Sequence, residues 1–82
     1  MTRFHPHAEA RLSERGITRE EVFETVQTGE QHAVRRGRTC FRKKFTYNRK
    51  WLGRYYPTKQ VDVIAVPDND DWLVITVISR FF

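Results

Sequence analysis

The feature that most constrains the fold is a change in hydrophobic periodicity at Gly29. Before this residue the apolar side chains recur at helical spacing, and after it apolar and polar residues alternate as they do in β-strands. The 82 residues, 39% of them hydrophobic, provide enough apolar surface for one small core. We therefore expect a single domain over residues 1–82, with helices first and strands afterwards.

Two short helices are predicted before the change in periodicity. The first opens at Thr2 or His5 and ends at Gly16, because glycine readily adopts the conformation that follows a helix. The second opens at a capping box, in which Thr18 is followed three residues later by Glu21, and continues to the glycine at which the periodicity changes.

The rest of the chain is predicted to form four strands, over residues 31–35, 39–47, 61–66 and 72–79. Turns are expected at 36–38 and 67–71, while residues 48–59 are either irregular or extend a strand. The last strand is apolar on both faces, which favours a central position. The expected fold is α+β, with two N-terminal helices packed on a curved four-stranded antiparallel sheet.

Positive charge is concentrated in one segment of the chain. Residues 35–60 contain ten lysines and arginines and no acidic residue, whereas the segments on either side are net acidic. Cations for phosphates interleaved with rings for bases are typical of a surface that binds single-stranded nucleic acid. The alternative is a solvated edge strand that its charges protect from aggregation. The interleaved rings are Phe41, Phe45, Tyr47, Trp51, Tyr55 and Tyr56.

Alternation within the predicted strands indicates which side chains would face a ligand. In the strand 39–47, Phe41 and Phe45 share the side that faces the core. Arg42 and Lys44 point to the other side, where contacts to phosphates would position RNA without reading its sequence. In the last strand, alternation places Trp72, Val74, Thr76, Ile78 and Arg80 on one face. Thr76 is the hydroxyl in this apolar run, although threonine is also an ordinary strand residue.

Three basic side chains border the apolar stripe of the first predicted helix. His7 and Arg11 lie one helical turn apart, and Arg15 follows one turn later. An imidazole beside a guanidinium on a helix is suited to general acid–base catalysis with a phosphate clamp. For Arg15 the alternative is a side chain that lies along the sheet edge or pairs with Glu14.

Other classes of site and location find little support in the sequence. His5 and His7 have neither a cysteine nor a spaced carboxylate beside them, so we expect no metal and no cofactor. Cys40 has no second cysteine to pair with, and its strand context favours burial. No apolar run approaches the ~18 residues of a membrane span, and the first residues lack the apolar stretch of a secretory signal. We therefore expect a cytoplasmic protein that has no membrane partner.

Two groups of residues follow a pattern shared with a known family. The first group is His7-Ala8, Arg11 and Glu14-Arg15-Gly16-Ile17-Thr18. The second group is Trp51, Tyr56, Lys59, Val61, Val74-Ile75-Thr76-Val77-Ile78 and Arg80. Together they resemble a small bacterial family that is associated with the RelE/ParE-like toxins of toxin–antitoxin pairs.

The resemblance implies a RelE-like fold and an endoribonuclease toxin with RNA as its substrate, an acidic antitoxin protein as its partner and the ribosome as a further candidate partner. Cleavage would need no metal, because the 2′-hydroxyl of the substrate would attack and leave a 2′,3′-cyclic phosphate. His7 would be the base or the acid and Lys59 the other of the two. Arg11 and Arg80 would clamp the phosphate, and Tyr56 would stack on a base.

Two further classes of function stay open. One is a non-catalytic nucleic-acid-binding module that uses the same basic segment. The other is a toxin that acts on a protein target, with the basic surface meeting an acidic partner. The candidate nucleic-acid contacts are Arg15, Arg42, Lys44, Trp51, Tyr56 and Thr76.

Overall fold

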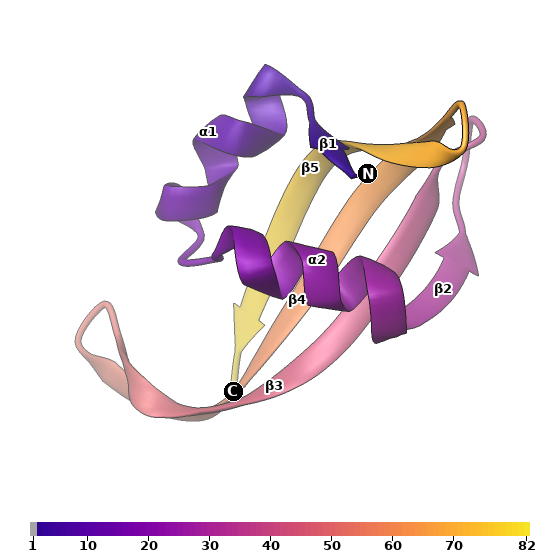
Figure 1. The fold of residues 1–82 in the computed structure, drawn as a ribbon. Helices are drawn as coiled ribbons and strands as arrows, with labels where there is room; N and C mark the ends of the chain where they lie inside the picture. Colours follow the sequence, from indigo (N-terminus) through magenta and orange to yellow (C-terminus); the bar gives the residue numbers. More distant parts are fainter. Residues whose placement is uncertain (1) are drawn as a thin grey trace.

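Two helices cover one face of a five-stranded sheet in the computed structural model, which describes residues 2–82 (Figure 1). The helices are α1 (Pro6–Glu14) and α2 (Arg19–Thr28). The strands are β1 (Arg3–Phe4), β2 (Glu30–Ala33), β3 (Thr39–Trp51), β4 (Arg54–Asp68) and β5 (Asp71–Phe81). More than half of the residues lie in strands, and within the described chain neither helix is long and apolar enough to cross a membrane.

The sheet is mixed, with the strand order β1-β5-β4-β3-β2. The strand β1 pairs parallel to β5, and all the other pairs are antiparallel. The predicted four-stranded antiparallel sheet, and the RelE-like architecture based on it, are therefore wrong. The sequence does not indicate β1 because a strand of two residues has no visible alternation; it forms because β5 offers it a free edge. The central strand is β4 rather than the predicted 72–79 segment.

The helix ends lie where the sequence predicts them. His5 is the N-cap of α1, and its Nδ1 accepts the N–H of His7. Gly16 follows that helix with φ of +65°, in the left-handed region that favours glycine. The predicted capping box is confirmed, because the Thr18 hydroxyl accepts the Glu21 N–H and the Glu21 carboxylate accepts the Thr18 N–H.

The core lies between the two helices and the face of the sheet that they cover. Its buried residues come from α1, the α1–α2 connection, α2 and the three long strands; they are Ala8, Leu12, Ile17, Val22, Phe41, Val61, Val63, Ala65, Val74 and Val77. Trp72 packs edge-to-face against Phe41, with the ring centroids 4.9 Å apart. The helix-facing side of the sheet is thus apolar along most of its length.

A shift in register between β4 and β5 changes which β5 side chains face the core. The pairs Ile64↔Thr76 and Ala65↔Val74 enclose an extra residue in β5, which is a β-bulge. Val74 therefore faces the helices, whereas Thr76 lies on the opposite face, which we call the open face. The prediction that Trp72, Val74, Thr76, Ile78 and Arg80 share one face is wrong for this reason.

Residues 48–59, which the sequence left undecided, complete a long hairpin between β3 and β4. Paired residues Trp51 and Arg54 close a two-residue turn. Along β3, pairing with β2 extends only as far as the pair Glu30↔Arg42. Along β4, pairing with β5 begins next to Thr58, so the residues before it have no partner on that side. Residues 47–57 therefore form a two-stranded ribbon that projects beyond the sheet (Figure 1). We call this segment the ribbon.

Candidate nucleic-acid interface

The open face is where the sequence places two of the candidate phosphate contacts, Arg42 and Lys44. Arg42 is held there by Asp62, to which it donates two hydrogen bonds, Nε to Oδ1 at 2.9 Å and Nη2 to Oδ2 at 3.0 Å. The Gln60 Nε2 also donates to Asp62 Oδ1 at 3.3 Å, and Asp62 is only 6% exposed. The hydrogen bond and the charge of Asp62 raise the pKa of Arg42. A phosphate would have to compete with this carboxylate for the Arg42 guanidinium.

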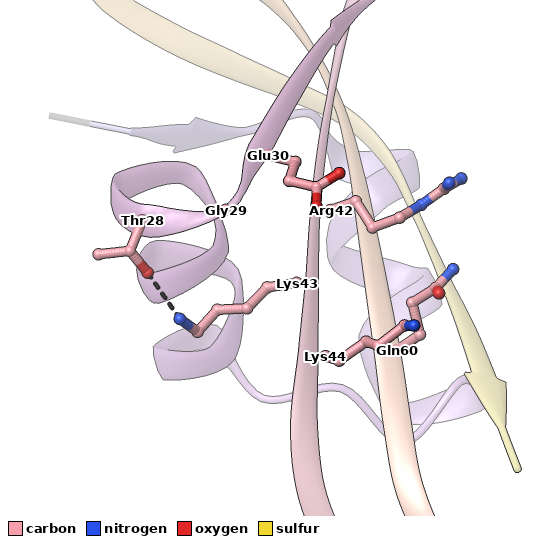
Figure 2. Close-up of a pocket in the computed structure, with 7 residues that line it drawn as sticks. All are labelled: Thr28, Gly29, Glu30, Arg42, Lys43, Lys44 and Gln60. Atoms are coloured by element: carbon pink, nitrogen blue, oxygen red, sulfur yellow. Dashed lines mark hydrogen bonds between the residues drawn. The ribbon is translucent and has the colours of Figure 1, made fainter.

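A pocket of about 390 Å³ opens where the end of α2 meets the exposed edge of β3 (Figure 2). Its lining residues are Thr28, Gly29, Glu30, Arg42, Lys43, Lys44 and Gln60. Lys43 leaves β3 toward α2, where its amine donates to the Thr28 hydroxyl at 2.9 Å and lies 3.5 Å from the Glu24 carboxylate. Lys44 projects to the opposite side and lies 5.6 Å from the Phe82 ring centroid. Since two of its three cations are already paired with acids, this pocket is a weak site for an anion.

Lys59, a predicted catalytic residue, is buried on the helix side of the sheet with 1% of its surface exposed. Its amine donates to the Gly16 carbonyl and, at 2.6 Å, to the Glu21 carboxylate. These contacts tie the α1–α2 connection to β4. They leave the amine without access to a substrate in this arrangement.

The other predicted catalytic residues do not gather around Lys59. His7 is exposed on α1, while the Arg11 guanidinium pairs with Glu14 at 2.6 Å. Arg80 pairs with Gln60, one position away from the Lys59↔Phe81 pair, so it projects from the opposite face of the sheet. The structure brings His7 and Arg11 together on one helix and separates both Lys59 and Arg80 from them.

Arg15 and Thr76 have mainly structural surroundings. The Arg15 carbonyl accepts a hydrogen bond of 2.8 Å from the Ser79 hydroxyl, which joins the end of α1 to β5. The Nε of Arg15 is buried and has no hydrogen-bond partner within the described residues. Thr76 is half-buried on the open face opposite Ile64.

Three rings of the basic segment, Tyr47, Trp51 and Tyr56, pack against Phe81. Trp51 stacks on Phe81 with centroids 5.1 Å apart and planes within 13°. Tyr47 and Tyr56 pack around the same Phe81 ring at 5.1 and 5.7 Å. A Cβ on Gly16 would lie 2.6 Å from Trp51, so the glycine allows this ring to approach. This ring cluster fastens the ribbon to the sheet, and among the ribbon's rings only Tyr55 is largely exposed, at 57%.

The basic segment does not form one continuous patch. Within residues 2–82, seven of its ten cations have no ion pair with a carboxylate; they are Arg35, Arg36, Arg38, Lys44, Arg49, Lys50 and Arg54. The first three lie in the β2–β3 connection, at the end of the sheet that also holds the acidic β4–β5 turn (Figure 1). Arg49, Lys50 and Arg54 lie at the other end of β3, in the ribbon.

The turn at the ribbon tip combines an exposed apolar side chain with an unfavourable backbone. Leu52 is 86% exposed and has φ of +51°, and Gly53 follows with φ of +85°. Two positive φ values define a type I′ turn, whose first position is usually asparagine, aspartate or glycine. The left-handed conformation costs an ordinary side chain about 1–2 kcal/mol. Sequence reasoning overlooked Leu52, although a leucine-glycine pair between cations was the available signal.

A family model described as "Domain of unknown function (DUF4258)" matches residues 4–79. The chain belongs to this family. The matched residues include both helices and the whole ribbon, so the ribbon is not an addition to the DUF4258 domain. No curated protein and no solved structure matches the chain. The description of DUF4258 gives no activity and no link to RelE/ParE toxins.

Proposed function

We propose that this DUF4258 protein binds nucleic acid through the ribbon, mainly by contacts between its cations and phosphates. The observation that supports this is the position of Arg49, Lys50 and Arg54 on a projecting two-stranded ribbon, within a segment that lacks any acidic residue. Each phosphate that such a cation neutralises releases condensed counterions, and this release favours binding. RNA is the polymer that we expect from the sequence.

The ribbon cations are better placed for this role than Arg42 and Lys43, which line the pocket beside β3. Arg42 and Lys43 would have to give up carboxylates, whereas no carboxylate of the described residues competes for the ribbon cations. The Arg49 guanidinium lies 4.7 Å from the Tyr47 ring centroid, and that of Arg54 lies 6.0 Å from Tyr56. Cation–π contacts restrict the side-chain conformations without neutralising the charge, so the entropy cost of binding is smaller.

A salt titration with matched variants tests this proposal. Affinity for a fluorescent single-stranded RNA is measured by anisotropy over a range of salt concentrations. Replacing Arg49 and Lys50 by glutamine should weaken binding and reduce the slope of log affinity against log salt by roughly 0.7 for each phosphate that is no longer neutralised. The control replaces Arg35 and Arg36 by glutamine, which removes the same charge near the acidic turn. An affinity independent of salt, or equal losses in both variants, would contradict the ribbon as the binding site.

A ribonuclease toxin is a second candidate, because the His7 imidazole is exposed, is free of ion pairs within the described residues and has Arg11 one turn away. If His7 acts as a general acid or base, the rate of RNA cleavage should fall by a factor of about 10²–10⁴ in His7→Ala, while RNA affinity stays nearly unchanged. Growth arrest on induced expression, relieved by an acidic partner protein, would support the toxin. Cleavage that continues unchanged in His7→Ala would exclude the histidine from the reaction.

A further inference from the structure

We propose that Leu52 is an apolar wedge that inserts between stacked base pairs of a nucleic-acid duplex, while the ribbon cations contact the flanking phosphates. This inference rests on the proposed function and specifies its ligand as double-helical rather than single-stranded. It concerns the tip of the ribbon alone.

The tip presents an apolar side chain where both solvation and backbone geometry disfavour one. Leu52 is the most exposed large apolar residue in the described chain and has a positive φ, which asparagine would adopt at lower cost. No helix or other strand of residues 2–82 covers the turn (Figure 1). A leucine at this position becomes favourable when a ligand removes its side chain from water.

The charges around Leu52 favour a polyanion as that ligand. Arg49 and Lys50 precede the turn on β3, and Arg54 follows it on β4, so cations flank the leucine on both strands. Tyr55 is exposed beside them, and its hydroxyl donates to the Asn48 side chain at 3.0 Å. Proteins that unstack a base step combine an apolar wedge with cations in this way.

The shape of the ribbon favours a duplex over a single strand. Two strands with free outer edges are narrow enough to enter a groove, and their cations can then reach phosphates on both of its walls. A single strand would instead need exposed rings for its bases. The best candidate for such a ring, Trp51, directly precedes the tip turn but is stacked on Phe81.

The test measures unstacking directly, with 2-aminopurine placed in the centre of a duplex. The wild-type protein should raise the fluorescence of this base, in DNA duplexes, RNA duplexes or both, and the two arms identify the polymer. Leu52→Asn should abolish the fluorescence response and weaken affinity by a factor of about 10 to 100, as expected when a leucine side chain is no longer buried. The slope of log affinity against log salt should be the same for this variant as for the wild type, since the phosphate contacts remain. The variant should fold, because asparagine suits the first position of a type I′ turn.

Two controls and one competing ligand complete the design. Leu52→Met should retain the response, and Val34→Thr, at an exposed apolar position outside the ribbon, should leave it unaltered. An unchanged response and affinity in Leu52→Asn would overturn the wedge while leaving the binding function intact. Absence of any nucleic-acid binding by the wild type would overturn both proposals. Binding to phosphatidylserine vesicles that depends on Leu52, without a fluorescence response in duplexes, would overturn the wedge and show that the tip binds membranes instead.

Discussion

Replacing Lys59 by methionine tests whether this buried lysine stabilises the fold or takes part in chemistry. The side chain is almost completely buried, and its amine contacts the Gly16 carbonyl and the Glu21 carboxylate. Methionine has a similar length and no charge, so the substitution removes the ion pair and leaves little empty volume. We expect a large loss of stability and no specific loss of function.

The expected loss follows from what remains after the amine is removed. Breaking a buried ion pair by removing one partner costs about 3–5 kcal/mol when the other charge stays buried. Here the Glu21 side chain is 20% exposed and still accepts the Thr18 N–H at 2.9 Å, so we expect about 2–3 kcal/mol. The whole fold of an 82-residue chain has a free energy of unfolding of roughly 4–12 kcal/mol. The substitution would therefore remove a large fraction of it.

Urea denaturation followed by circular dichroism measures this loss. A double-mutant cycle with Glu21→Gln, which keeps an acceptor for the Thr18 N–H, should give a coupling energy of about 1–2 kcal/mol between the two side chains. High salt should change the coupling little, because buried pairs are poorly screened. If Lys59→Met instead changes stability by less than about 0.5 kcal/mol and abolishes RNA cleavage, the amine is available to a substrate and our structural assignment is refuted.

Three smaller predictions concern local features of the fold. Gly16→Ala should destabilise the protein by at least about 1 kcal/mol, because the residue has a positive φ and its new methyl would meet Trp51, and Trp fluorescence should report the displaced ring. Thr18→Ala should cost about 1 kcal/mol in urea denaturation through loss of the capping box with Glu21, and an unchanged midpoint would contradict the capping role. Burial raises the pKa of the Cys40 thiol, so the native state favours the neutral thiol. Its contribution to the free energy of unfolding is therefore complete at neutral pH and declines as pH rises above about 8.5, where the thiol of the unfolded chain ionises. Thermal melts between about pH 7 and 10.5 should show this decline in the wild type and a smaller one in Cys40→Ala.

The ends of both helices and the location of positive charge follow from the sequence alone. Thr18 and Glu21 form their capping box within one helical turn, and His5 caps α1 through a contact two residues away. Such interactions join residues that are close in the chain, so the sequence specifies them locally even though tertiary packing stabilises these short helices. The acid-free segment 35–60 is likewise a property of composition.

Which of those charges and rings are free to bind a ligand depends on the tertiary fold. Arg42 forms an ion pair with Asp62, twenty positions away, and Trp51 stacks on Phe81, thirty positions away. These partners meet because β3, β4 and β5 pair in one register, and the bulge beside Ala65 reverses the facing of the later β5 residues. A shift of one residue in register moves every side chain to the other face of a sheet, and strand composition alone does not specify that shift.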